Sequence, residues 1–377
     1  MKKLLIYLPL ILLLACTKNE HVGIPTDANA THETTALYHN LKQLAYTSVL
    51  YGHQDDLAYG YSWWAEDGRS DVKESVGAYP AVIGWELGDL SQGVEENLDG
   101  VRFDNMKRWI KQAYEGGSIN TISWHMNHPI TGGDSWDTTP GVSAILPGGA
   151  KHSLYKDWLD LFADFLSDLT GERGEYIPII FRPFHEHTGS WFWWGDDQTS
   201  IEDYRAIWIF TLEYLRDQKG IHHLIYAYSP DGGGGYHFQD YMKKYPGDTF
   251  VDILGFDDYA SFMRDTSRVE ELSAELGQIV EWAREKDKIA AWTETGLEAV
   301  AEPQWFTNSM LAAIKHHPSA MGIAYALTWR NANFEREQRN HFYAPHPDHE
   351  SVADFIRFYQ DSLTLFQDGL PNLYEMR

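Results

Sequence analysis

The sequence predicts a (β/α)8 barrel, a TIM barrel of the α/β class, over residues 34–377. Eight short apolar runs alternate with segments in which apolar residues recur every three or four positions. The apolar runs are continuous, which is typical of parallel strands buried on both faces. An open doubly wound sheet is the alternative, but no glycine-rich nucleotide fingerprint follows the first run.

Each predicted strand begins with apolar residues and ends with polar or aromatic ones. The eight strands are SVLYGHQDD (48–56), AVIGWELGD (81–89), INTISWHM (119–126), YIPIIFRPFHE (176–186), HLIYAYSPD (223–231), VDILGFDDY (251–259), IAAWTETG (289–296) and IAYALTWRN (323–331). Amphipathic helices are predicted over 101–117, 154–169, 201–218 and 269–286. Because barrel active sites lie at the C-terminal ends of the strands, these polar endings are the predicted site.

The N-terminus has the pattern of an exported lipoprotein. Two lysines precede the apolar run LIYLPLILLLA, and LLAC at residues 13–16 matches a bacterial lipobox. We expect residues 1–15 to be a cleaved signal peptide and Cys16, the only cysteine, to carry the lipid. Residues 16–33 are polar and predicted to be a flexible tether. The expected product is a monomeric outer-membrane lipoprotein of a bacterial cell envelope, facing the periplasm or the cell surface.

Composition excludes some partners. The formal net charge is −25, which makes nucleic acids and anionic membrane surfaces poor partners. A metal-dependent hydrolase is the rival chemistry, but no helix carries a His-Glu-x-x-His spacing. We therefore expect no catalytic metal and no cofactor. The residues that could serve as metal ligands are His53, Asp55, Asp56, His185, Glu186, His187 and the histidines of 341–350.

Carboxylates and aromatic rings dominate the strand endings, a composition that suits sugar binding. Glu186 ends the fourth predicted strand and Glu294 the seventh, and glycoside hydrolysis requires two carboxyl groups. Strict alternation would point Arg182, Phe184 and Glu186 toward the barrel axis, with Arg182 as a buried cation beside the carboxyls. A purely structural Arg182–Glu186 ion pair is the alternative. Alternation would turn His185 away unless the strand bulges or ends there.

Five motifs at separate strand ends, in the expected order, carry a resemblance to glycoside hydrolase family 26, whose best-known members are β-mannanases. The resemblance covers most of residues 34–377. The motifs are SWHMNHP (123–129), RPFHEHTGSWFWWG (182–195), GFDDY (255–259), WTETG (292–296) and TWRN (328–331).

The resemblance implies that Glu186 is the general acid/base and Glu294 the nucleophile of a retaining mechanism. An ionised Glu294 would favour a protonated Glu186, as the first step requires. The implied substrate is β-1,4-mannan, glucomannan or galactomannan, cleaved in endo fashion. Arg330 is implied to reach a sugar further toward the non-reducing end. The residues implied to line the subsites are His125, Trp136, His185, Trp191, Tyr259 and Trp329.

Three alternatives stay open from the sequence. An exo-acting member would release mannobiose from chain ends, and the loops 90–100 and 331–350 would decide whether one end of the cleft is walled off. Some members of the family act on xylan or mixed-linkage β-glucan. A glycan-binding surface lipoprotein without catalysis would share the aromatic surface and the anchor but would not need two glutamates.

Overall fold

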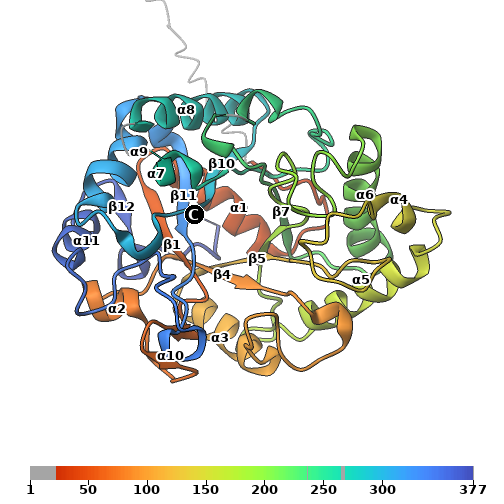
Figure 1. The fold of residues 1–377 in the computed structure, drawn as a ribbon, viewed down its shortest axis with the longest axis horizontal. Coiled ribbons are helices and arrows are strands. Elements are labelled where there is room, and N and C mark those ends of the chain that lie inside the picture. The colour runs from red at the N-terminus through yellow and green to blue at the C-terminus, as the bar shows by residue number, and fades with distance from the viewer. Residues whose placement is uncertain (1–22, 236, 265–267, 377) are drawn as a thin grey trace, which may run out of the picture.

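The fold is a closed barrel of parallel strands surrounded by helices, as the sequence predicts (Figure 1). The structure is a computed structural model that describes residues 23–235, 237–264 and 268–376. The predicted signal peptide and Cys16 lie outside the described residues. Among the described residues, no helix has the length and apolar character needed to cross a membrane.

Eight parallel strands form the barrel, and each predicted strand contains one of them. The pairing of β11 with both β10 and β1 closes the sheet. The sixth predicted strand is interrupted, because a separate bridge, β9 (Asp257–Asp258), pairs with β10 after β8 ends. The barrel strands are β1 (Val49–Gln54), β4 (Val82–Glu86), β5 (Ile119–Ser123), β6 (Ile179–Arg182), β7 (Leu224–Tyr228), β8 (Ile253–Leu254), β10 (Ile289–Thr295) and β11 (Ile323–Thr328).

Helices cover the outside of the barrel, and all four predicted helical segments are confirmed. In α3, the buried residues Met106, Ile110 and Ala113 recur every three or four positions and give the helix its inner face. The helices are α1 (His32–Leu44), α2 (Asp71–Val76), α3 (Phe103–Glu115), α4 (Val142–Ile145), α5 (His152–Ser167), α6 (Ile201–Glu213), α7 (Ala260–Arg264), α8 (Val269–Glu285), α9 (Ala312–His316), α10 (Phe334–Glu337) and α11 (Val352–Tyr359).

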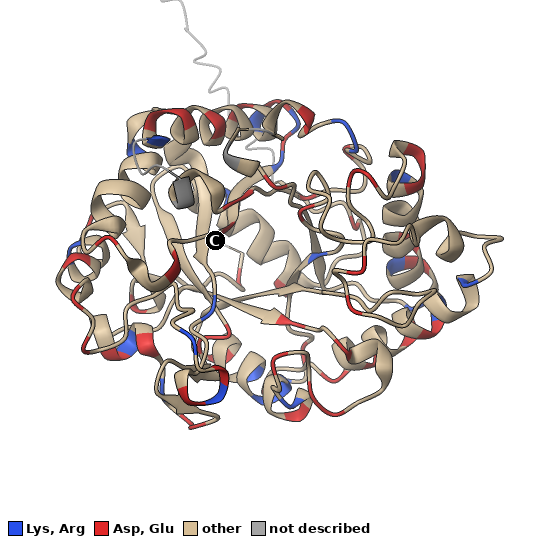
Figure 2. Cartoon of the chain, in the orientation of Figure 1, with Lys and Arg blue, Asp and Glu red and all other residues tan. Residues whose placement is uncertain are grey.

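Two small strand pairs complete the sheet structure. β12 (Thr364–Leu365) pairs with the start of β1, and β2 (Tyr59–Gly60) forms an antiparallel pair with β3 (Trp63–Trp64). The β2–β3 pair follows β1 at the end of the barrel that carries the polar strand endings. Acidic residues are spread over helices and loops on every side of the molecule (Figure 2).

The second half of the predicted tether, from residue 23 onward, is folded against the barrel in the structure. Residues 23–31 lie against the barrel base, formed by the N-terminal ends of the strands. The backbone N–H of Thr26 donates to Asp252, which precedes β8, at 2.6 Å, and Asp27 pairs with His222, which precedes β7, at 2.8 Å. The sequence signal failed here because these anchoring contacts are polar and join residues about two hundred positions apart. The folded body therefore begins at or before residue 23.

Candidate active site

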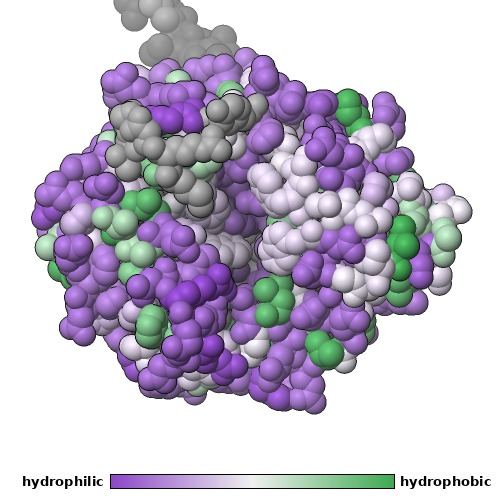
Figure 3. Space-filling model, viewed as in Figure 1, coloured by the Kyte–Doolittle hydropathy of each residue, from purple (hydrophilic) through white to green (hydrophobic). Residues whose placement is uncertain are grey.

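Three carboxylates meet at the C-terminal ends of the strands. Asp257 lies on β9, Glu294 on β10 and Glu186 in the turn after β6, and one oxygen of each lies within 4.8 Å of the others. Asp257 is buried, Glu294 is 4% exposed and Glu186 is half-buried. Figure 3 shows that this face of the molecule is hollowed near its centre. The spacing of the two glutamates is compatible with the separation of about 5–5.5 Å that retaining glycosidases use.

Strand β6 ends earlier than predicted, which changes where its side chains point. The backbone leaves the strand after Arg182 and turns through positive φ angles at Phe184 (49°) and Glu186 (54°). The predicted alternation is therefore wrong at Phe184. This fully buried ring packs against Trp193, Trp194 and Tyr204 instead of facing the barrel axis.

The early end of β6 also changes the direction in which the His185 side chain points. It lies 3.3 Å from His125, Nε2 to Nε2, so the turn places this buried ring beside a residue that lines the cleft. The strained φ at Glu186 is sterically costly for a residue with a Cβ. The backbone N–H of Glu186 donates to the carbonyl oxygen of Ser229 at 2.8 Å, and this bond helps to hold the turn.

Arg182 is bonded to two of the three carboxylates. It donates through Nη1 to Asp257 at 3.0 Å and through Nη2 to Glu294. The structural Arg182–Glu186 ion pair is not the observed arrangement, and Glu186 is left without a cationic partner among the described residues. Removal from water raises the pKa of Asp257 to about 7, with Arg182 acting in the opposite direction and Glu294 adding to the rise.

The two oxygens of Glu294 are held separately. Arg182 donates to Oε1, and the Tyr259 hydroxyl donates to Oε2 at 3.0 Å. Both donors stabilise the carboxylate anion and fix its orientation. Glu294 is thus held as an oriented anion facing the cleft.

Glu186 has a different environment. Trp191 donates from Nε1 to Glu186 Oε2 at 2.8 Å. Gly189 permits this contact, because a Cβ at that position would lie 2.2 Å from the Trp191 ring. Desolvation raises the pKa of Glu186 well above its usual range, and the charges of Glu294 and Asp257 raise it further. These surroundings favour the protonated form of Glu186, whereas two hydrogen-bond donors stabilise the carboxylate of Glu294, and general acid catalysis and nucleophilic attack require such a pair.

A cleft of about 570 Å³ lies beside the carboxylates. The Trp136 ring, which is 49% exposed, stacks on the His125 ring at 5.1 Å with 12° between the planes. Trp329 lies edge-on to His125 at 6.4 Å. The residues lining this cleft are Glu86, Leu98, Asp99, His125, Trp136, Trp329, Arg330, Glu337, Arg339 and His341. Flat rings beside charged hydrogen-bonding groups suit the apolar faces and hydroxyls of sugars.

A profile of "Glycosyl hydrolase family 26" matches residues 26–333. The chain belongs to glycosyl hydrolase family 26. A mannan endo-1,4-beta-mannosidase of Bifidobacterium adolescentis is 35% identical in an alignment of length 326 that covers 81% of this chain and 32% of that protein. The chain thus spans about a third of the length of that relative. A mannan endo-1,4-beta-mannosidase of Bacillus subtilis strain 168 is 27% identical, covering 72% of this chain and 76% of that protein.

Solved structures of the family share the fold. The GH26 beta-mannanase BoMan26A from Bacteroides ovatus is 41% identical, with a TM-score of 0.86 and coverage of 92% of this chain and 98% of that chain. A modular endo-beta-1,4-mannanase from Cellulomonas fimi is 35% identical, with a TM-score of 0.84 and coverage of 93% and 79%. This family 26 chain therefore has the barrel of those enzymes.

Arg330 links two loops at one end of the family 26 cleft. Its guanidinium donates to both carboxylate oxygens of Glu337, at 2.6 and 3.1 Å, and pairs with Asp99 at 3.2 Å. Asp99 belongs to the loop 90–100 and Glu337 to the loop 331–350. Both loops line the cleft, so Arg330 joins them in its wall.

Sequence reasoning did not select several residues that this family 26 site depends on. Glu86 accepts two hydrogen bonds from His125, and Asp257 holds Arg182. Both were among the polar strand endings, but the endings of the eight strands contain other acidic residues and offered no basis for choosing between them. Asp99 lay in a loop without any pattern.

The histidines that offered metal ligands are engaged in separate contacts. His53 bonds Asp56 at 2.8 Å, and His187 bonds Tyr228 at 3.0 Å. In the described part of the chain, the acidic group with spacing suitable for a metal is Glu186, Asp257 and Glu294. Arg182 already supplies positive charge to two of these three carboxylates.

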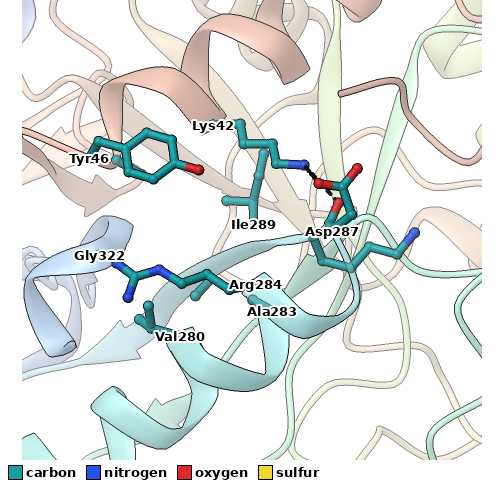
Figure 4. A pocket seen from close by; sticks show the side chains of 11 residues that line it. Lys42, Tyr46, Val280, Ala283, Arg284, Asp287, Ile289 and Gly322 are labelled. Atoms are coloured by element: carbon teal, nitrogen blue, oxygen red, sulfur yellow. Dashed lines mark hydrogen bonds and ion pairs between the residues drawn. The ribbon is translucent and has the colours of Figure 1, made fainter. Parts of the chain in front are cut away.

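A smaller pocket lies at the other end of the barrel, between α1, the C-terminal end of α8 and the start of β10 (Figure 4). Its volume is about 90 Å³. Lys42 and Asp287 form an ion pair of 2.5 Å at its edge, and Arg284 lines the opposite side. It lacks a pair of facing carboxyl groups, so the cleft above the strands is the candidate catalytic site of this family 26 chain.

Replacing Trp191 by Phe is expected to raise the pKa of Glu186. The Trp191 hydrogen bond favours the ionised form, so its loss should extend the pH range in which Glu186 is protonated. One hydrogen bond of about 1 kcal/mol corresponds to a shift of roughly 0.7 pH units. Carboxyl 13C NMR titration of Glu186 measures the shift. Trp136→Phe, which changes a cleft ring that bonds neither glutamate, is the control, and equal shifts in both variants would contradict the assignment.

Proposed function

We propose that the protein hydrolyses β-1,4-mannosidic linkages of mannan, glucomannan or galactomannan with retention of configuration. The observation that carries the proposal is the pair Glu186 and Glu294, which lie close together in different environments: Arg182 and Tyr259 donate to Glu294, and desolvation raises the pKa of Glu186. The relatives named mannan endo-1,4-beta-mannosidase support mannan as the substrate and endo action as the mode.

In this proposal, each group has a role in a double displacement. Glu186 donates its proton to the glycosidic oxygen while Glu294 attacks the anomeric carbon, giving a covalent glycosyl-enzyme. Formation of the ester removes the negative charge of Glu294, which lowers the pKa of Glu186. Glu186 then takes a proton from water, and the water attacks the anomeric carbon and releases Glu294. Tyr259 and Arg182 keep Glu294 oriented in the free enzyme.

One observation favours a second mode of action, release of mannobiose from chain ends. The Asp99–Arg330–Glu337 contacts join the loops 90–100 and 331–350 in the wall of the cleft. The β2–β3 pair supports this closure, because Arg336 stacks 3.7 Å from the Trp64 ring and His346 stacks 4.3 Å from the Tyr61 ring. A closed end would limit the number of sugars bound on the non-reducing side.

The proposed setting is the bacterial cell envelope, with a lipid on Cys16. Cys16 lies seven positions before Gly23, a reach of about 25 Å when the chain is fully extended. Because residues 23–31 lie at the barrel base, an anchor on Cys16 attaches to the end opposite the catalytic pair. The cleft would then face away from the membrane, toward a polymeric substrate.

Replacing Glu294 by Ala should reduce kcat on mannan by more than about 10⁴-fold while substrate binding is retained. Glu186→Ala should keep slow turnover of aryl mannobiosides with good leaving groups, and azide should accelerate it by attacking the glycosyl-enzyme. Initial-rate assays with isothermal titration calorimetry separate turnover from binding. A Glu294→Ala variant with unchanged activity would contradict the proposal, and so would release of reducing sugar by the wild type from xylan or lichenan but not from mannan.

Endo action predicts a rapid fall in viscosity of galactomannan and several early products from mannopentaose. Chain-end action predicts mannobiose as the dominant early product and little loss of viscosity. A product time course with protein starting at Thr17 distinguishes them. If the loop closure restricts the cleft, Asp99→Ala should shift the wild-type pattern toward longer early products, whereas Asp104→Ala, an exposed change on α3, should not. The same pattern in both variants would show that the closure does not set the mode.

Replacing Cys16 by Ser should abolish lipid attachment. The wild-type protein is expected in the membrane fraction, with mass spectrometry showing an acylated N-terminal peptide that begins at Cys16. The Cys16→Ser protein should lack the lipid mass, and a fully processed variant that stays membrane-bound after a high-salt wash would contradict the anchor.

A further inference from the structure

Glu86, at the end of β4, is surrounded by hydrogen-bond donors. Oε1 accepts from the backbone N–H groups of Gly88 at 2.6 Å and His125 at 2.7 Å. Oε2 accepts from the Ser123 hydroxyl at 3.0 Å and from Nδ1 of His125 at 2.7 Å. The side chain is 1% exposed. A carboxylate that accepts four hydrogen bonds in a buried site is stabilised as an anion.

The position of Glu86 fixes the tautomer of His125. Since Oε2 of a carboxylate can only accept, the Nδ1 atom of His125 carries a proton. The other ring nitrogen, Nε2, lies 3.3 Å from Nε2 of His185. Two facing nitrogens form a hydrogen bond only when one of them donates, so one proton is shared between the two rings.

The surroundings favour His125 as the ring that carries a second proton. Burial alone opposes its charge, but the nearby carboxylates outweigh burial and raise the pKa of His125. The surroundings of His185 have the opposite effect. Burial lowers its pKa well below the usual range, and the positive charges of His125 and Arg182 lower it further. The Trp136 ring stacked on His125 adds a favourable cation–π contact. The charged or titratable groups that face His125 are Glu86, Asp99, Glu294, His185 and, across the same cleft, Arg330.

We propose that Glu86 is a positioning residue that holds His125 as an imidazolium, with its Nε2–H available as a charge-assisted donor to a sugar hydroxyl in the cleft. The inference rests on the proposed function, because it assigns a ligand group at the same site. The Glu86–His125 pair is neutral overall, so it provides a strong donor without adding net positive charge beside the catalytic carboxyls. In the free protein, His185 accepts this hydrogen bond and keeps the donor oriented.

The proposal predicts the direction in which substrate affinity changes with pH. A folded-state pKa raised above the usual value of about 6.5 keeps His125 protonated to a higher pH than an unperturbed histidine, and the donor is lost as the pH rises through that folded-state pKa. Substrate affinity should therefore fall on the alkaline side, in addition to any loss caused by ionisation of Glu186. The two losses are separable, because loss of the donor weakens substrate binding whereas ionised Glu186 slows turnover.

Histidine 15N and 13C NMR on the ligand-free protein tests the proposal without any substrate. In the wild type, both ring nitrogens of His125 should be protonated at pH 6.5, and its titration midpoint should lie above that of an unperturbed histidine. Glu86→Gln should lower the midpoint by more than about one pH unit, since a buried charge partner is lost. Ser123→Ala, which removes one neutral donor to Glu86, should leave it within a few tenths of a unit.

Two outcomes would overturn the proposal. The first is a wild-type His125 that is neutral at pH 6.5, which needs no variant to observe. The second is an unchanged midpoint in a folded Glu86→Gln protein. A kinetic arm on mannopentaose should show that Glu86→Gln raises KM several-fold with a smaller change in kcat at pH 6. If the wild type lacks mannan hydrolysis while the NMR result holds, the proposed function fails and the proton assignment stands.

Discussion

The catalytic centre depends on the contacts of one buried cation, Arg182. Three carboxylates beside the cleft each have an oxygen within 4.8 Å of the other two. Like charges at this separation repel strongly when they are removed from water. Arg182 donates hydrogen bonds to Asp257 and Glu294 but not to Glu186. Removing one partner of such a buried pair costs about 3–5 kcal/mol, because the other charge is then left buried without compensation. The two glutamates differ chemically because Arg182 bonds Glu294, whereas Glu186 is removed from water beside two other carboxylates.

The end of β6 is the second constraint. The chain leaves the sheet directly after Arg182. Positive φ angles at Phe184 and Glu186 then direct consecutive side chains to different parts of the structure. Phe184 enters the aromatic core with Trp193 and Trp194, whereas His185 and Glu186 face the cleft. The aromatic residues that follow Glu186 in the sequence therefore have different roles. Trp193 and Trp194 are buried packing residues, and Trp191 bonds the candidate acid.

The hydrogen bonds around the cleft follow a common plan. Three groups expected to meet sugar are oriented by charged partners: Glu294 by the buried Arg182, His125 by the buried Glu86, and Arg330 by the partly exposed Glu337. These supporting groups lie on the barrel strands or in the loops that directly follow them. A site built this way loses little entropy on binding, because its side chains are already fixed in the free protein.

The sequence by itself determined the barrel and the position of its polar rim, because hydrophobic periodicity is a local property of each strand and helix. It also selected Glu186 and Glu294 as candidates, since both end predicted strands beside aromatic residues. Only the tertiary structure decided which carboxylates Arg182 holds, which ring nitrogen of His125 is bonded, and how Arg330 joins two loops. Those contacts join residues between seven and more than two hundred positions apart, and alternation along a strand cannot predict a side chain beyond the residue at which the strand ends.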